Sequence, residues 1–221
     1  MAVIHHTTLS PTKLELLARW LPEQDWYAPQ PGGPQPGGPQ PGSPQPGSPQ
    51  LSRAGGFRLD DPAGEVGIEF MIVLDGEQAY LTPMTYRGAA LAGGADALIG
   101  MTEHGVLGTR WVYDGVRDPV LTGQAAALIQ GTVRAQAQSE SDTPDLTVAS
   151  RPLAGVAAAD LAVTVVRALQ PGGTAVPGEV SATWTAADGT VVRGTVVRGT
   201  VVRDTVVRDT VVRGTVTRDT V

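Results

Sequence analysis

The sequence predicts an α+β protein in which an antiparallel β-sheet packs on one or two helices. Apolar side chains alternate along residues 66–74 with the period of two that is typical of a strand. Apolar residues recur with helical spacing after Pro11 and again after Asp118. Two short-unit repeats leave about 165 residues for the globular part, the size of one ordinary domain.

The N-terminal segment is predicted to form a strand followed by a helix. Residues 2–9 are expected to be the strand. Ser10 then offers an N-cap side chain and Pro11 a first helical residue, a combination that favours a helix start. The expected apolar stripe of this helix comprises Leu14, Leu17, Ala18 and Leu21.

A meander of three strands is predicted next, at residues 56–60, 66–74 and 78–86. Turns rich in Asp and Gly separate these strands. The core face of the middle strand is expected to comprise Val66, Ile68, Phe70, Ile72 and Leu74. Pro83 in the third strand predicts an edge position or a bulge, because proline has no N–H to donate to a neighbouring strand.

A second helix of about three turns is predicted after Asp118 and Pro119, which repeat the pattern of a helix start. Its apolar stripe is Leu121, Ala125, Leu128 and Ile129, and Gly131 ends it. Residues 140–145 are expected to form a polar loop. Two further segments resemble strands, at residues 161–169 and 179–185.

Residues 29–50 repeat the unit Pro-Gln-Pro-Gly-(Gly/Ser). Such a segment has no apolar side chains to offset the entropy lost on ordering, so a disordered linker is predicted between residues 1–28 and the remainder of the domain at 51–189. A proline-rich ligand for an aromatic groove is the alternative. No Arg or Lys lies inside the repeat to orient such a ligand.

Residues 190–221 repeat Thr-Val-Val-Arg-(Gly/Asp) with a period of five. Strand side chains alternate with period two, so the facing of each Val pair reverses from one unit to the next. The alternatives are a solenoid-like coil, a strand that pairs in its first units and then frays, and a disordered tail. We favour the second, with residues 183–185 and 191–193 paired across a turn at 187–189.

Composition excludes several classes of protein. The net charge is −6, which argues against nucleic acid as a partner. The chain has no cysteine, so it has neither disulfides nor a Cys-ligated zinc site. No signal peptide and no apolar stretch of membrane-spanning length is present. A cytoplasmic protein without a membrane partner is expected, and its oligomeric state is left open.

The motif Tyr-Leu-Thr-Pro-Met-Thr-Tyr-Arg at residues 80–87 is followed by Ala-Leu-Ile-Gly at 97–100, Trp-Val-Tyr-Asp at 111–114 and Asp118-Pro119. In order and spacing this set resembles the N-terminal cap domain of maltokinases. The resemblance covers roughly residues 1–28 and 51–140 and continues weakly to about residue 190. It implies a cystatin-like sheet over a long helix. It also implies a domain that sits in front of a separate ATP-binding and phosphotransfer module. The chain departs from the family pattern at Met84, where Leu is expected, and in both repeats.

Kinase chemistry is not expected from this chain alone. It contains no Asn, its single lysine is Lys13, and no glycine-rich phosphate loop is present. We therefore predict a non-catalytic interaction module linked to maltose, trehalose or glycogen metabolism, whose partner is a separate kinase or another enzyme of that metabolism. The alternative is a small sugar- or nucleotide-binding protein, or one part of a sugar kinase system with a separate catalytic subunit.

Six residues are candidates for contact with a ligand: Tyr80, Tyr86, Glu103, His104, Trp111 and Tyr113. Aromatic rings can stack on sugars, although packing in the core explains them equally. Glu103 and His104 could act as an acid–base pair or lie in a solvated turn. A metal site would need His104 together with His5 and His6, whose side chains point to opposite faces of a strand. No metal and no cofactor is expected.

Overall fold

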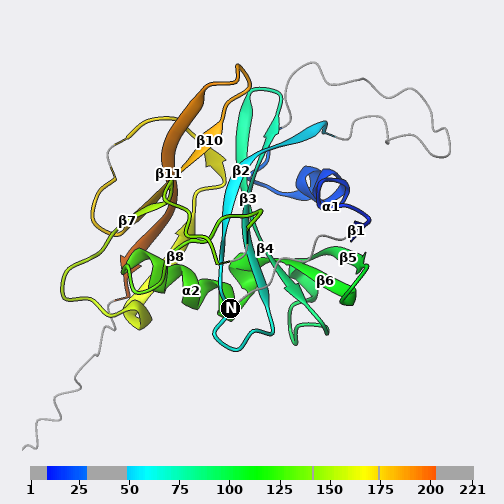
Figure 1. Ribbon diagram of the computed structural model, residues 1–221, viewed down its shortest axis with the longest axis horizontal. Coiled ribbons are helices and arrows are strands. Elements are labelled where there is room, and N and C mark those ends of the chain that lie inside the picture. Colours follow the sequence, from blue (N-terminus) through cyan, green and yellow to red (C-terminus); the bar gives the residue numbers. More distant parts are fainter. Residues whose placement is uncertain (1–8, 29–48, 141, 174, 203–221) are drawn as a thin grey trace, which may run out of the picture.

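The computed structural model describes residues 9–28, 49–140, 142–173 and 175–202 (Figure 1). Most of the predicted linker, the repeat units after Val202 and nearly all of the predicted first strand lie outside these residues. Eleven strands occur in the described part: β1 (Leu9–Ser10), β2 (Leu51–Leu59), β3 (Gly67–Asp75), β4 (Gln78–Arg87), β5 (Leu98–His104), β6 (Gly108–Asp114), β7 (Ala149–Arg151), β8 (Leu161–Val165), β9 (Ala168–Leu169), β10 (Glu179–Thr185) and β11 (Val191–Val201).

All strand pairs are antiparallel, and two short helices, α1 (Lys13–Trp20) and α2 (Pro119–Ile129), pack on the sheet. The predicted α+β class is therefore confirmed. Four short 3₁₀ helices complete the elements: η1 (Leu21–Glu23), η2 (Ala95–Ala97), η3 (Gly115–Arg117) and η4 (Ala158–Asp160). The strands lie in the order β1-β5-β6-β4-β3-β2-β10-β11-β8.

The segment that contains β8 and β9 closes part of this sheet into a ring. β8 pairs with β11, and the N–H of Val166 donates to the carbonyl of Val196. A few residues later β9 pairs with β4, and the N–H of Leu81 donates to the carbonyl of Arg167. The path from β4 through β3, β2 and β10 to β11 thus returns to β4. The ring surrounds the main core, in which Phe57 stacks on Phe70 and α2 contributes Leu121 and Ile129.

The predicted core face of the middle strand is correct, but β3 is buried on both faces. Ile68, Phe70 and Ile72 face the main core. Met71 and Val73 face a second core, in which α1 contributes Leu16, Leu17 and Trp20. Because α1 covers this second face, side chains that alternation alone assigned to the solvent are buried instead.

The predicted start of α1 is wrong by two residues. The N-cap is Thr12, whose hydroxyl accepts a hydrogen bond from the Glu15 N–H, while the Glu15 carboxylate accepts one from the Thr12 N–H. This reciprocal capping box satisfies two backbone donors at once, which outweighs the single cap that Ser10 offers. The buried residues of α1 are Leu16, Leu17 and Trp20. Of the predicted stripe, Leu17 and the adjoining Leu21 are buried, whereas Leu14 and Ala18 are half-buried.

The prediction that Pro83 marks an edge or a bulge is also wrong. β4 lies inside the sheet, and its register with β3 is continuous from Gln78 to Tyr86. The far side of β4 is shared between β9, which pairs at Ala79 and Tyr80, and β6, which pairs from Met84 onward. The N–H of Leu81 points to that side, so by alternation the nitrogen of Pro83 does too. Proline therefore sits in the gap between two partner strands, where no donor is required.

The second helix is confirmed as predicted. The Asp118 carboxylate caps α2 by accepting the Val120 N–H, and Pro119 is the first helical residue. All four residues of the predicted stripe are buried. Gly131 follows the end of the helix with a φ of 69°, a conformation that favours glycine. The meander of β2, β3 and β4 is confirmed as well, although β2 begins five residues earlier than predicted, at Leu51.

The first repeat units pair as predicted, and a bulge accommodates their period of five. Thr183, Trp184 and Thr185 lie opposite Arg193, Val192 and Val191. The register then shifts between Val180 and Ser181, so that Val196 is an extra residue in β11. The extra residue reverses the alternation once, and both Val196 and Val197 are fully buried in the main core. The fraying of the later units falls outside the described residues.

Candidate functional site

The hairpin of β5 and β6 has one covered face and one open face. On the covered face the Thr102 hydroxyl donates to the carbonyl of Pro11 at 2.7 Å, and Val112 is fully buried in the second core. A side chain at Gly100 would touch Leu16 of α1. The segment from β1 to α1 therefore shields this side of the hairpin, and any partner must approach from the other side.

The open face is formed by Leu98, Met101 and Trp111, with Glu103 and Thr109 beside them. Met101 lies directly opposite Trp111, so their side chains share one face. A register shift between Leu98 and Gly100 brings Leu98 opposite Tyr113. Tyr113 is two residues after Trp111 in β6, so Leu98 lies on the same face as Trp111. Leu98 is 37% exposed and Met101 is 44% exposed. Val106 and Leu107 extend the exposed apolar surface to the tip of the hairpin.

Glu103 and His104 lie on opposite faces of β5 because they are adjacent residues of a strand. The Glu103 carboxylate accepts a hydrogen bond from the Thr109 hydroxyl at 2.6 Å. Nδ1 of His104 accepts the N–H groups of Val106 and Leu107 and so holds the hairpin turn. The structure does not bring the two side chains together as an acid–base pair, and each has a local structural task.

Three of the predicted aromatic contacts are tyrosines that pack within the protein, Tyr80 and Tyr113 buried and Tyr86 half-buried. Tyr80 is 1% exposed and its hydroxyl donates to the carbonyl of Ala28 at 2.8 Å. The Tyr86 hydroxyl donates to the carboxylate of Glu69 at 2.7 Å. The hydroxyl of Tyr113 accepts the N–H of Leu91. Tyr80 and Tyr86 share the face of β4 that packs in the second core, where the core-packing interpretation accounts for both rings. A ligand role for these residues stays a prediction.

Trp111 is half-buried, as Tyr86 is, but Tyr86 packs against the second core and Trp111 belongs to the open face. Glu103 is exposed on the same face. Of the six candidates, the structure thus brings Glu103 and Trp111 together at a surface. Tyr80 and Tyr113 are buried, and Tyr86 is half-buried against the second core.

A cluster of polar side chains surrounds the buried carboxylate of Glu69 between α1 and the sheet, and the sequence analysis did not predict it. Glu69 is 5% exposed. Its Oε2 accepts from Lys13 Nζ at 2.6 Å and from Tyr86, and its Oε1 accepts from the Gln138 amide at 3.0 Å. Arg53 in turn donates to the Gln138 carbonyl oxygen. Burial, reinforced by the neighbouring Glu69 carboxylate, raises the pKa of Tyr86 well above its ordinary value. The only visible signal was Glu69 itself, a charged residue followed directly by five apolar residues of β3.

A second cluster joins the segment after α1 to the sheet through aromatic rings. Trp26 packs edge-on against Trp20 and carries the Arg167 guanidinium 4.7 Å from its ring centre. Arg167 also donates to the carboxylate of Asp114. The Tyr27 hydroxyl donates to Asp75 at 2.5 Å, and burial together with that contact raises the pKa of Tyr27. Trp26 is thus in contact with Trp20, Tyr80 and Arg167, and the Arg167 guanidinium lies over the ring where a sugar would stack.

Metal and membrane sites were searched among the described residues only. No group of three or more His, Asp or Glu side chains there is arranged to hold a metal ion. His5 and His6 lie outside that part of the chain, so the three-histidine site was not tested. Neither described helix combines the length and the apolar character that crossing a membrane requires. The cytoplasmic location stays a prediction.

These features define a small antiparallel-sheet module with an open apolar face and two polar clusters that fasten its N-terminal helix. Residues 42–118 match the family model of the maltokinase N-terminal cap domain, which is less than half of the chain. The match includes β2 to β6 and therefore the whole open face. It confirms the resemblance that the motifs at residues 80–87 and 111–114 indicate. No curated protein matches the chain, and no solved structure does.

Proposed function

We propose that this chain is a non-catalytic, maltokinase-cap-like module that docks an enzyme of α-glucan metabolism through the open face of β5 and β6. The observation that carries the proposal is the position of Leu98, Met101 and Trp111. Leu98 and Met101 are exposed and Trp111 is half-buried, and all three lie inside the segment that matches the cap family. Apolar and aromatic side chains at the centre of a surface are the residues that contribute most to protein–protein affinity.

Lys13 supports the non-catalytic part of the proposal. A kinase uses lysine as a point charge on the phosphates of its nucleotide. The only lysine of this chain forms an ion pair with the buried Glu69 at 2.6 Å and lies 5.3 Å from the centre of the Tyr86 ring. This side chain is engaged in holding α1 on the sheet.

The occupant we propose is a phosphotransferase or another enzyme that acts on maltose, trehalose or glycogen. The cap family gives the reason, because an N-terminal cap domain of a maltokinase precedes a catalytic module. The partner should present an apolar surface at its own docking site, since the open face offers Leu98, Met101 and Trp111 and only one carboxylate, that of Glu103.

The test is affinity purification of the tagged full-length chain from its native cell. The bait is compared with Met101→Glu and with the matched control Leu146→Glu, which places the same charge on a side chain that is 88% exposed and lies outside the open face. We expect an α-glucan enzyme to co-purify with the unmodified chain and with the control. Met101→Glu should weaken the purified pair about 30-fold, which corresponds to about 2 kcal/mol.

Two results would count against the proposal. One is recovery of the bait alone under gentle salt, and the other is equal retention of the partner by all three baits. Thermal unfolding in the presence of maltose, trehalose and ATP tests the alternative of a ligand-binding protein. A ligand at 100 times its dissociation constant should add about 2.7 kcal/mol of stability. Such stabilisation would favour the alternative.

A further inference from the structure

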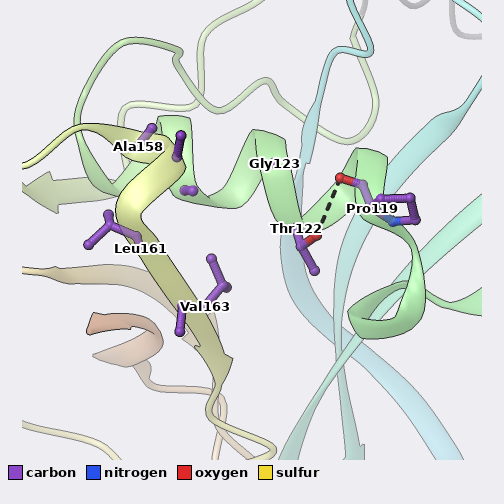
Figure 2. Close-up of a pocket in the computed structure, with 9 residues that line it drawn as sticks. Pro119, Thr122, Gly123, Ala158, Leu161 and Val163 are labelled. Atoms are coloured by element: carbon purple, nitrogen blue, oxygen red, sulfur yellow. Dashed lines mark hydrogen bonds between the residues drawn. The ribbon is translucent and has the colours of Figure 1, made fainter. Parts of the chain in front are cut away.

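A shallow apolar groove runs between α2 and the segment from η4 to β8 (Figure 2). Its volume is about 350 Å³. In Figure 2 the helix wall carries Pro119, Thr122 and Gly123, and Ala158, Leu161 and Val163 form the opposite wall. The Pro119 end of the groove lies near the open face, because the adjoining Asp118 binds Arg87, which is opposite Trp111. The groove runs from there along α2 toward η4 and β8.

The lining of the groove does not suit a sugar or a nucleotide. Sites for such ligands combine apolar walls with a few convergent polar groups. Here the only polar side chain in the lining is that of Thr122, whose hydroxyl is 3.3 Å from the carbonyls of both Asp118 and Pro119. That hydroxyl is committed to the backbone of its own helix. The groove therefore suits small apolar side chains.

The rim of the groove is also the edge of the sheet. β8 is the last strand in the order, and within the described residues it pairs with β11 alone. An edge strand presents backbone N–H and C=O groups to a further extended segment. A peptide bound here would gain hydrogen bonds from β8 and place alternate side chains in the groove, as in recognition by strand addition.

The chain itself brings a suitable segment to this position. β11 ends at Val201, opposite Leu161, and the N–H of Val202 donates to the carbonyl of Asp160 at 2.9 Å. The last described residue, Val202, therefore lies beside the groove wall, and residues 203–221 follow it in the sequence. They continue the sequence Thr-Val-Val-Arg, and in β11 this same sequence already pairs with β8. The helix wall from Pro119 to Ala126 is about 10 Å long, which three or four extended residues would span.

We propose that the α2–β8 groove is the intramolecular docking site for the valine pairs of the repeat units that follow Val202, foremost Val206 and Val207. The tail would then cover an apolar surface that the fold leaves open, and it would occupy a sheet edge that could otherwise pair with a second chain. This inference is independent of the open face and of its partner.

The absence of cysteine permits a direct test with the full-length chain. Ala162 lines the groove and is exposed, so Ala162→Cys introduces a single thiol at the site. Its reaction rate with a thiol reagent is compared with that of the same chain carrying Val206→Ser, Val207→Ser, Val211→Ser and Val212→Ser. Ala63→Cys, at an exposed turn remote from the groove, serves as the control position.

We expect the thiol at position 162 to react at least about tenfold faster when the four valines are replaced, and the thiol at position 63 to react equally in both chains. Equal rates at position 162 would overturn the proposal. A rate that depends on protein concentration would overturn it as well, because it would assign the groove to the tail of a second copy. Circular dichroism of each variant confirms that the fold is retained.

Discussion

The guanidinium of Arg87 forms two hydrogen bonds of 2.7 Å, from Nε and Nη2, with the two carboxylate oxygens of Asp118. Asp118 is fully buried and also caps α2, so one carboxylate connects the end of β4 to the start of the helix that packs on the main core. Burial by itself would raise the pKa of Asp118. The hydrogen bonds from Arg87 and from the Val120 N–H lower it below its ordinary value of 3.8.

Replacing Asp118 with Asn should lower the free energy of unfolding by about 2 kcal/mol, because it removes a charged bidentate contact while Asn still caps the helix. The difference between the two proteins should also depend on pH. A depressed folded-state pKa stabilises the protein above the ordinary value, and this contribution disappears as the pH falls through the folded-state pKa. Urea unfolding at pH 7 and at pH values below 3.8 measures both effects. A difference that stays constant over this range would contradict the assignment.

The buried Glu69 should make Lys13 important for stability. Lys13→Met removes the cation and leaves the carboxylate with only the neutral donors Tyr86 and Gln138, so we expect a loss of about 2 kcal/mol. Combining it with Glu69→Gln should recover part of that loss, since no uncompensated charge then remains. Chemical denaturation of the four proteins of this double-mutant cycle gives the coupling energy. Simple additivity of the two losses would contradict the predicted coupling.

Gly194 should tolerate no side chain, although it repeats in a unit where other copies carry Asp. A Cβ at this position would clash with the carbonyl of Gln170 and lie 2.8 Å from the Trp184 ring. Gly194→Ala is therefore expected to destabilise the protein by about 1–3 kcal/mol through overpacking. The comparison is Gly123→Ala at the groove wall of α2, where no described atom lies within 4 Å of the added Cβ and the better helix former should stabilise by about 1 kcal/mol. Thermal melting compares the two, and a shift of the same sign would refute the interpretation.

Stability should decrease above pH 10 because three tyrosine hydroxyls are held in their neutral form. Burial raises the pKa of Tyr27, Tyr80 and Tyr86 above 10.0. When a folded-state pKa is raised, the stabilisation is complete below the unfolded value and is lost as the pH rises through the folded one. The near-ultraviolet absorbance of folded protein should show these tyrosines ionising later than in urea. Coincident titration of the folded and unfolded chains would contradict this expectation.

Local sequence patterns correctly predicted the helix and the hairpin whose cap, turn and apolar residues all indicate the same boundaries. Asp118 and Pro119 begin α2 as expected, since the cap and the apolar stripe point to the same boundary. The hairpin of β10 and β11 pairs in the predicted register because an Asp-Gly turn fixes it. The start of α1 was missed because two caps compete within three residues. The position of Pro83 was missed because the gap between β9 and β6 is made by strands far away in the sequence.

The candidate site was predictable only in part for the same reason. Trp111 and Glu103 reach a surface. α1 packs over the face of β4 that carries Tyr80 and Tyr86, and the segment with Leu91 contacts the hydroxyl of Tyr113. Nothing near Glu69 in the sequence indicates that Lys13 and Gln138 will converge on it. Contacts between residues so far apart depend on which elements pack together, and alternation along a single strand carries no information about that.

By itself the sequence determined the α+β class, the meander and the second helix, because periodicity, caps and turn residues act over a few neighbouring positions. The motifs between residues 80 and 119 separately indicated the resemblance to the maltokinase cap. The tertiary structure decided which faces are covered. Both faces of β3 are buried, and β8 and β9 close the ring. A bulge at Val196 places both Val196 and Val197 in the main core despite the odd period of the repeat. These outcomes depend on packing between distant segments, and the free energy of burying apolar surface selects among them only when the whole chain has folded.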